Sequence, residues 1–164
     1  MRMAIERLPE HFGKALEWAS QQPGSAVVQP MSLSVNVVYT GPETTMKALQ
    51  AAQSFVGELN STVHIRAMIA VPRQLGMAEG LVSRRFFQKL LSDLVKRVGS
   101  DRCEYVLHFY LCRNRIETLL KVLRPSSLVV IGGRRRLWPT AESRLSKAAV
   151  AAGHSVAFIE TRAF

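Results

Sequence analysis

The sequence predicts an α/β domain: an open, doubly wound sheet of five parallel strands with helices on both faces, preceded by an N-terminal helical extension. Three observations lead to this fold class. Strand-like and helix-like segments alternate from residue 32 onward, which is typical of a parallel sheet. The alternation begins and ends with a strand. The chain of 164 residues suits a single domain, for which right-handed crossovers favour an open sheet over a barrel.

Five segments have the apolar runs or the two-residue alternation typical of strands. In the second of them, Ile65, Ala67, Ile69 and Val71 all fall on one face. The predicted strands cover residues 33–39, 63–71, 104–111, 128–131 and 155–160.

Four segments between these strands have apolar residues at helical spacing. Pro42 suits the first turn of the first helix, and Asn114 with Glu117 has the spacing of a capping box. Gly153 stands where the last helix should be capped. The predicted helices cover residues 42–59, 83–98, 114–123 and 140–152.

Residues 1–31 stand outside this alternation, so we divide the chain into an N-terminal extension, 1–31, and an α/β domain, 32–164. Residues 9–19 have the pattern of one amphipathic helix, followed by a linker-like QQPGS stretch. The extension can pack on the domain, fray, or bind a partner, and the sequence leaves these alternatives open.

The composition indicates in which compartment we expect the protein. No apolar run reaches the about 20 residues that a membrane helix needs, and no signal peptide is recognisable at the N-terminus. Cys103 and Cys112 fall on opposite faces of a strand, so we expect free thiols in a reducing compartment. We therefore expect a cytoplasmic protein without a membrane partner.

The net charge of +10 is concentrated, because residues 113–136 alone carry seven basic residues and one acidic residue. Ligands of open α/β sheets bind outside the carboxyl ends of the strands. Arginines follow four of the five predicted strands: Arg73, Arg113, Arg115, Arg134, Arg135, Arg136 and Arg162. The pattern predicts that they surround one crevice and bind an anion such as phosphate. A solvated basic rim is the alternative.

Gly132 and Gly133 follow the fourth apolar strand and would let a ligand approach the backbone closely. At this point the chain resembles the universal stress protein family over residues 32–162, in its strand–helix order and in one motif. ATP-binding members carry Gly-x-x-Gly-x9-Gly-Ser/Thr after the fourth strand. Gly132 and Ser146 match this motif, whereas Arg135 and Leu145 replace its second and third glycines.

The resemblance implies ATP or another adenine nucleotide as the ligand, with the need for magnesium left open. It also implies a homodimer formed through the last strand, 155–160. Together with the strand-end pattern, it predicts a ligand site made of Thr40, Gly41, Val71, Arg73, Arg113, Gly132, Gly133, Arg134, Arg135 and Ser146.

The first functional hypothesis is thus a small regulatory protein, similar to universal stress proteins, that binds a nucleotide or another phosphate-bearing ligand. The two replaced glycines favour an alternative, a dimeric scaffold with a decayed ATP site. A weaker alternative is nucleic-acid binding by the basic edge, although no nucleic-acid-binding signature is present.

No catalytic motif supports an enzyme. The sequence has no P-loop and no nucleophile elbow, and its four histidines are far apart. We expect His64 and His108 to be structural histidines on strands. We expect Trp138 to pack over a helix end, with stacking on a base as the alternative.

Overall fold

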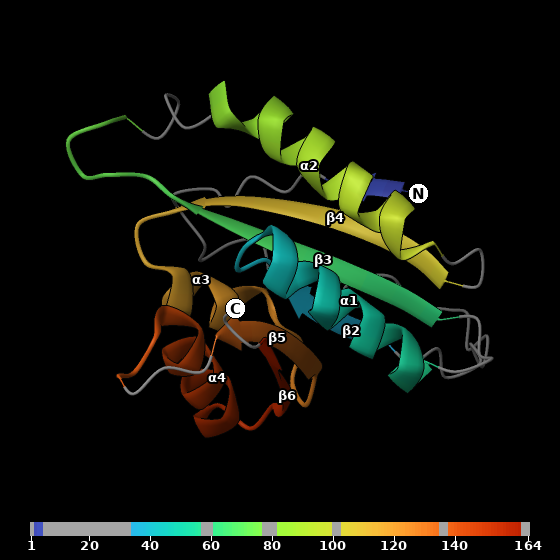
Figure 1. Ribbon diagram of the computed structural model, residues 1–164. Coiled ribbons are helices and arrows are strands. Elements are labelled where there is room, and N and C mark those ends of the chain that lie inside the picture. Colours follow the sequence, from blue (N-terminus) through green and yellow to red (C-terminus); the bar gives the residue numbers. More distant parts are fainter. Residues whose placement is uncertain are drawn as a thin grey trace, which may run out of the picture.

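The computed structural model describes residues 2–4, 34–56, 61–76, 82–99, 103–134 and 138–161. It confirms the predicted α/β fold with a parallel sheet and helices on both faces (Figure 1). The five predicted strands are β2 (Ser34–Val38), β3 (Ser61–Ala70), β4 (Cys103–Cys112), β5 (Leu128–Arg134) and β6 (Ser155–Thr161).

A sixth strand, β1 (Arg2–Ala4), extends the sheet beyond the predicted five, in the order β1-β4-β3-β2-β5-β6. It pairs in parallel with β4, with Ala4 opposite His108. Sequence analysis missed it because three residues are too short to display an alternating pattern. The helix predicted over residues 9–19 lies outside the described residues.

The four predicted helices are α1 (Pro42–Val56), α2 (Val82–Val98), α3 (Arg115–Val122) and α4 (Ala141–Ala151). α1 and α2 cover one face of the sheet, and α3 and α4 cover the other (Figure 1). Each face has its own apolar core, because the central strands are buried on both sides. Within the described residues, no helix is long and apolar enough to cross a membrane.

The winding of the chain reverses between β2 and β5. From β2 the chain passes through α1 to β3 and through α2 to β4, always toward the same edge. It then returns through α3 to β5, on the other side of β2, and continues through α4 to β6. The carboxyl ends of β2 and β5 therefore flank the topological switch point, where open α/β sheets form a crevice.

Two glycines that the sequence placed in a turn belong instead to β5. At Gly132 a Cβ atom would overlap the backbone carbonyl of Thr44 in α1, and at Gly133 it would overlap the ring of Phe158 in β6. A Gly-Gly pair after an apolar run is typical of a turn, but here it allows neighbouring elements to pack against the strand backbone.

A polar cluster interrupts the apolar core on the face that α3 and α4 cover. Its members come from β2, β3 and β4: Asn36, His64, Arg66, His108 and Tyr110. Nδ1 of His64 lies 2.9 Å from Nε2 of His108, so each histidine is the other's hydrogen-bond partner. Burial, and then the charges of Arg66 and His64, lower the pKa of His108 from 6.5 to about 4.

We expect Gly132→Ala to destabilise the fold by about 3 kcal/mol, because the new methyl group collides with backbone that cannot rotate away. Gly76→Ala is the matched control, since a Cβ at Gly76 meets nothing within 4 Å. Urea unfolding of both variants measures the difference. Equal free energies of unfolding would contradict the close packing of β5 on α1.

We also expect stability to fall as the pH decreases from about 6.5 to about 4. The folded state holds His108 neutral, so the unfolded chain binds the proton first and is favoured by acid. The loss from this group amounts to at most about 3 kcal/mol, from 1.36 kcal/mol per pKa unit. Urea unfolding at several pH values should show a flatter dependence for His108→Gln than for the wild type. Identical slopes would contradict this account.

Candidate ligand-binding site

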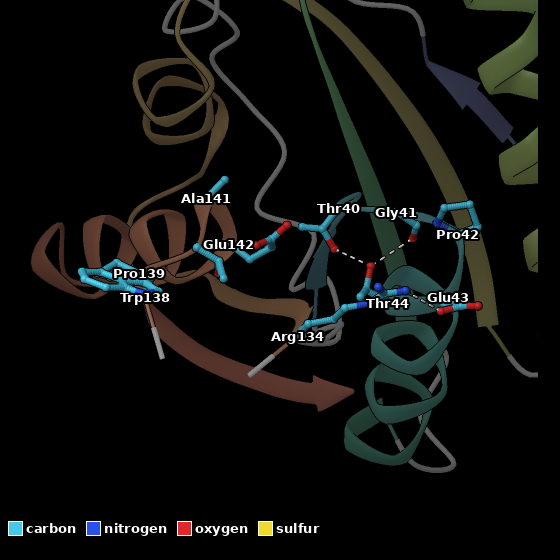
Figure 2. A pocket seen from close by; sticks show the side chains of 11 residues that line it. Thr40, Gly41, Pro42, Glu43, Thr44, Arg134, Trp138, Pro139, Ala141 and Glu142 are labelled. Carbon is cyan, nitrogen blue, oxygen red and sulfur yellow. Dashed lines mark hydrogen bonds and ion pairs between the residues drawn. The ribbon is translucent and has the colours of Figure 1, made fainter. Parts of the chain in front are cut away.

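A pocket of about 650 Å³ opens at the topological switch point (Figure 2). The end of β2, the end of β5 and the first turns of α1 and α4 meet there. Its lining residues are Thr40, Gly41, Pro42, Glu43, Thr44, Arg134, Trp138, Pro139, Thr140, Ala141 and Glu142. The prediction that a crevice forms at the carboxyl edge of the sheet is therefore met by the geometry.

The first turn of α1 leaves two backbone N–H groups at the pocket. Oγ1 of Thr45 accepts hydrogen bonds from the N–H groups of Thr40 (3.2 Å) and Gly41 (3.4 Å), which fixes the turn that enters the helix. Pro42 has no N–H. Among the described residues, none accepts a hydrogen bond from the N–H of Glu43 or Thr44, as is usual in a first turn.

The first turn of α4 is built in a similar way. Thr140 is its N-cap, and Oγ1 of Thr140 accepts from the N–H of Ser143 at 3.2 Å. The described part of the chain offers no acceptor for the N–H groups of Ala141 and Glu142. Four backbone N–H groups from two helix starts therefore belong to pocket residues, and the positive ends of two helix dipoles converge on one pocket.

The side chains of the pocket do not add to this positive potential. Arg134 donates from Nη2 to Oε2 of Glu43 at 3.0 Å, which pairs the one guanidinium group of the described lining. Glu142 adds a second carboxylate in the first turn of α4, where a helix dipole stabilises negative charge. The described side chains thus hold two negative charges and one positive charge, so the positive potential of the pocket comes from the backbone.

Three residues of the predicted site line this pocket: Thr40, Gly41 and Arg134. Thr40 lies between the two helix starts in Figure 2 and donates from Oγ1 to the carbonyl oxygen of Gly132 at 2.6 Å. Gly132 and Gly133 form the strand beside the pocket rather than its lining. Ser146 lies in the second turn of α4 outside the lining, and Arg135 lies outside the described residues.

The other three predicted residues gather at the end of β3, and none of them lines the pocket. Val71 is buried and Arg73 is exposed. The guanidinium group of Arg113 donates to the carbonyl oxygens of Val71 (2.9 Å), Pro72 and Leu75 (2.8 Å). Arg113 thus braces the loop that follows β3, and the described arginines do not surround one crevice.

The pocket also contains residues that the sequence analysis did not assign to it. These residues were detectable only as the starts of two predicted helices: Glu43, Thr44, Thr140, Ala141 and Glu142. Trp138 is 82% exposed on the pocket, so the expectation that it packs over a helix end is not met. Its indole face is accessible for stacking.

Several basic side chains of the segment 113–136 already have partners within the protein. Arg113 binds carbonyl groups, Lys121 pairs with Glu117, and Arg134 pairs with Glu43. Asn114 caps α3 through the N–H groups of Ile116 and Glu117, but among the described hydrogen bonds none returns from the N–H of Asn114 to the Glu117 carboxylate, so only half of the capping box forms. Fewer basic groups remain for a nucleic acid.

Comparison with known proteins supports the fold. No protein-family model matches the sequence, and no curated protein is significantly similar to it. The structure is similar to a crystal structure of a universal stress protein in complex with cAMP, with a TM-score of 0.51 and 14% identity, covering 79% of this chain and 97% of that chain. The resemblance to universal stress proteins is thus confirmed as a shared fold.

The similarity does not extend to the family's glycine motif. Leu145, at the position of the third glycine, is only 4% exposed and belongs to the core between α3, α4 and the sheet. A phosphate chain therefore cannot lie against a bare backbone at this position.

Arg113→Ala should lower the free energy of unfolding by about 1–2 kcal/mol, because three carbonyl groups lose a charged donor. The neighbouring change Arg73→Ala should alter it by no more than about 0.5 kcal/mol, since the Arg73 side chain is exposed. Chemical denaturation of both variants tests this difference. A larger effect for Arg73→Ala would show that the loop is braced differently.

Proposed function

We propose that this protein binds an adenine nucleotide, or a similar phosphate-bearing ligand, in the pocket at the switch point. The observation that carries the proposal is the convergence of two helix N-termini, with four N–H groups lacking a described acceptor, on one pocket. Backbone N–H groups at helix starts are a common phosphate-binding device. The phosphate would lie between the first turns of α1 and α4.

The remaining features of the pocket suit a nucleoside. Its volume of about 650 Å³ lies within the range of small-molecule sites. Trp138 offers an exposed ring on which a base can stack. Glu43 and Glu142 can accept hydrogen bonds from ribose hydroxyl groups or from the amino group of adenine.

The charge of the pocket favours ligands with a single phosphate group. The described lining holds two carboxylates against one paired guanidinium group, which disfavours a triphosphate. The cAMP complex of the similar universal stress protein supports a cyclic or simple monophosphate as the first ligand to test.

We propose a regulatory binding role rather than catalysis. The described lining holds hydroxyl groups, two carboxylates and one guanidinium group, and no histidine, lysine or cysteine is among these residues. Glu43 is paired with Arg134, and Glu142 lies in the first turn of α4. The fraction of protein with an occupied pocket would then vary with the concentration of the ligand.

Calorimetric titration of the purified protein tests this function. The ligands are cAMP, AMP, ADP and ATP, each with and without magnesium, with pyrophosphate and sulfate as anion controls. We expect saturable binding of one or more nucleotides that sulfate does not compete with at equal concentration. Equal weak responses to every anion would indicate a basic rim instead, and no response would favour the scaffold alternative.

Ala141→Asp should weaken binding of the preferred nucleotide about tenfold or more. The new carboxylate lies in the first turn of α4, where it repels phosphate but does not harm the helix. Gln50→Glu adds the same charge on an exposed position of α1 outside the lining, and its affinity should remain at the wild-type value. Titration of both variants measures the contrast. If the affinity of Ala141→Asp equals that of the wild type, the phosphate group does not bind in this pocket.

We also propose a homodimer formed through β6. This strand is an edge of the sheet, and no described strand pairs with its outer side. Four consecutive apolar residues along it are only partly buried: Val156, Ala157, Phe158 and Ile159. An exposed apolar edge of this kind favours pairing with a second copy.

Light scattering coupled to size-exclusion chromatography should give twice the monomer mass of 18.3 kDa. Ile159→Lys should shift the population to the monomer, because a charged side chain on an edge strand opposes pairing. Circular dichroism checks that the variant is folded. A wild type that elutes with the monomer mass at high concentration would rule out this dimer.

A further inference from the structure

One ion pair lies within the lining of the candidate pocket. Arg134, the last residue of β5, donates from Nη2 to Oε2 of Glu43 in the first turn of α1, at 3.0 Å. Figure 2 shows the Arg134 side chain pointing toward Glu43. The pair joins two elements that are far apart in the sequence and meet at the switch point.

The backbone positions of this pair are fixed, whereas its side chains are exposed to water. Arg134 stands opposite Thr161 where β5 pairs with β6, and Glu43 belongs to α1. The side chain of Arg134 is 48% exposed and that of Glu43 is 77% exposed. An exposed ion pair contributes little to stability, because water solvates both charges and two long side chains must be held in one geometry. The pair is therefore easy to open.

Opening the pair would leave neither charge buried. The Glu43 carboxylate faces water and stays in the first turn of α1, where the positive end of the helix dipole stabilises it. The Arg134 side chain makes no other described hydrogen bond, so its remaining N–H groups can take a new partner. A ligand anion can thus replace the carboxylate on Arg134 without leaving an unpaired buried charge.

The guanidinium group of Arg134 is close to the N–H groups that would hold a phosphate. Glu43 carries both the carboxylate that binds Arg134 and one of the four N–H groups without a described acceptor. The guanidinium group therefore lies within the length of one glutamate side chain from the start of α1. A phosphate group accepts two parallel hydrogen bonds from a guanidinium group, and its remaining oxygens can face backbone N–H groups.

We propose that Arg134 exchanges Glu43 for the phosphate group of the ligand, and that this exchange selects a terminal phosphate monoester over a cyclic diester. The proposal rests on the nucleotide-binding function proposed above. A monoester carries nearly two negative charges at neutral pH, whereas a cyclic diester carries one. Replacing the single charge of Glu43 by a monoester strengthens the attraction to Arg134, but a diester merely equals it. AMP is the expected ligand in preference to cAMP.

Calorimetric titration of the full chain with AMP and with cAMP tests this exchange. In the wild type, AMP should bind several-fold more tightly than cAMP. Arg134→Gln should weaken AMP binding about tenfold, because a charged donor to the phosphate is lost, and cAMP binding by no more than about twofold. Arg85→Gln, at an exposed arginine of α2 outside the lining, should leave both affinities unchanged.

A double-mutant cycle separates the exchange of partners from the mere loss of a negative charge. Glu43→Gln frees Arg134 and should tighten AMP binding by about two- to fivefold. Glu142→Gln is the matched control, because it removes a carboxylate of the lining that has no described ion pair. In the Arg134→Gln background, the gain from Glu43→Gln should shrink to the gain from Glu142→Gln, which should itself be the same in both backgrounds.

Two results would overturn the exchange while leaving the nucleotide site in place. One is equal affinity of the wild type for AMP and cAMP. The other is a gain from Glu43→Gln that is the same with and without Arg134. If neither nucleotide binds the wild type, the proposed function itself fails and the exchange fails with it. Circular dichroism of each variant checks that the fold is retained.

Discussion

The close approach of β5 to the first turn of α1 is the contact on which the pocket depends. Because Gly132 has no side chain, the strand backbone lies against the carbonyl group of Thr44, and Thr40 donates to the carbonyl oxygen of Gly132. Gly133 admits the ring of Phe158 and the Cβ of Glu142 in the same way. The two glycines therefore set the spacing of α1, β5, β6 and α4 around the switch point. A larger residue at either position would move a wall of the pocket.

This packing also determines where the positive electrostatic potential of the pocket comes from. Elements that meet this closely bring their helix starts together, so the positive potential comes from backbone N–H groups at fixed positions. The side chains oppose it: Glu43 neutralises Arg134, and Glu142 occupies the start of α4. Under the proposed function, such a site would favour a compact anion of low charge, because a longer phosphate chain would leave the two helix starts and meet carboxylates. The glycine motif of ATP-binding universal stress proteins leaves the backbone bare for a phosphate chain. Here the buried side chain of Leu145 fills the position of the third glycine.

The alternation of strands and helices was sufficient to predict the order of the elements and the edge at which a pocket forms, because hydrophobic periodicity reports burial directly. Thr40 and Arg134 followed from their places at strand ends. Arg113 could not be assigned, since a long side chain that ends a strand can turn to the pocket or to its own loop, and only tertiary packing decides. Gly132 and Gly133 were misread because a turn and a close-packed strand have the same local sequence.

The net charge of +10 does not by itself locate a candidate anion site in this protein. Arg113 donates hydrogen bonds to carbonyl groups of a loop, and Arg134 forms an ion pair with Glu43. Arg66 is buried and donates to the neutral side chain of Asn36. The formal charge of a residue acts at long range only when it is exposed and unpaired, and salt then screens it. Backbone N–H groups at a helix start act over about the first turn, where they can donate hydrogen bonds to a bound anion. The anion position proposed at the switch point therefore rests on two helix starts that the packing of β5 brings together, rather than on the basic surface.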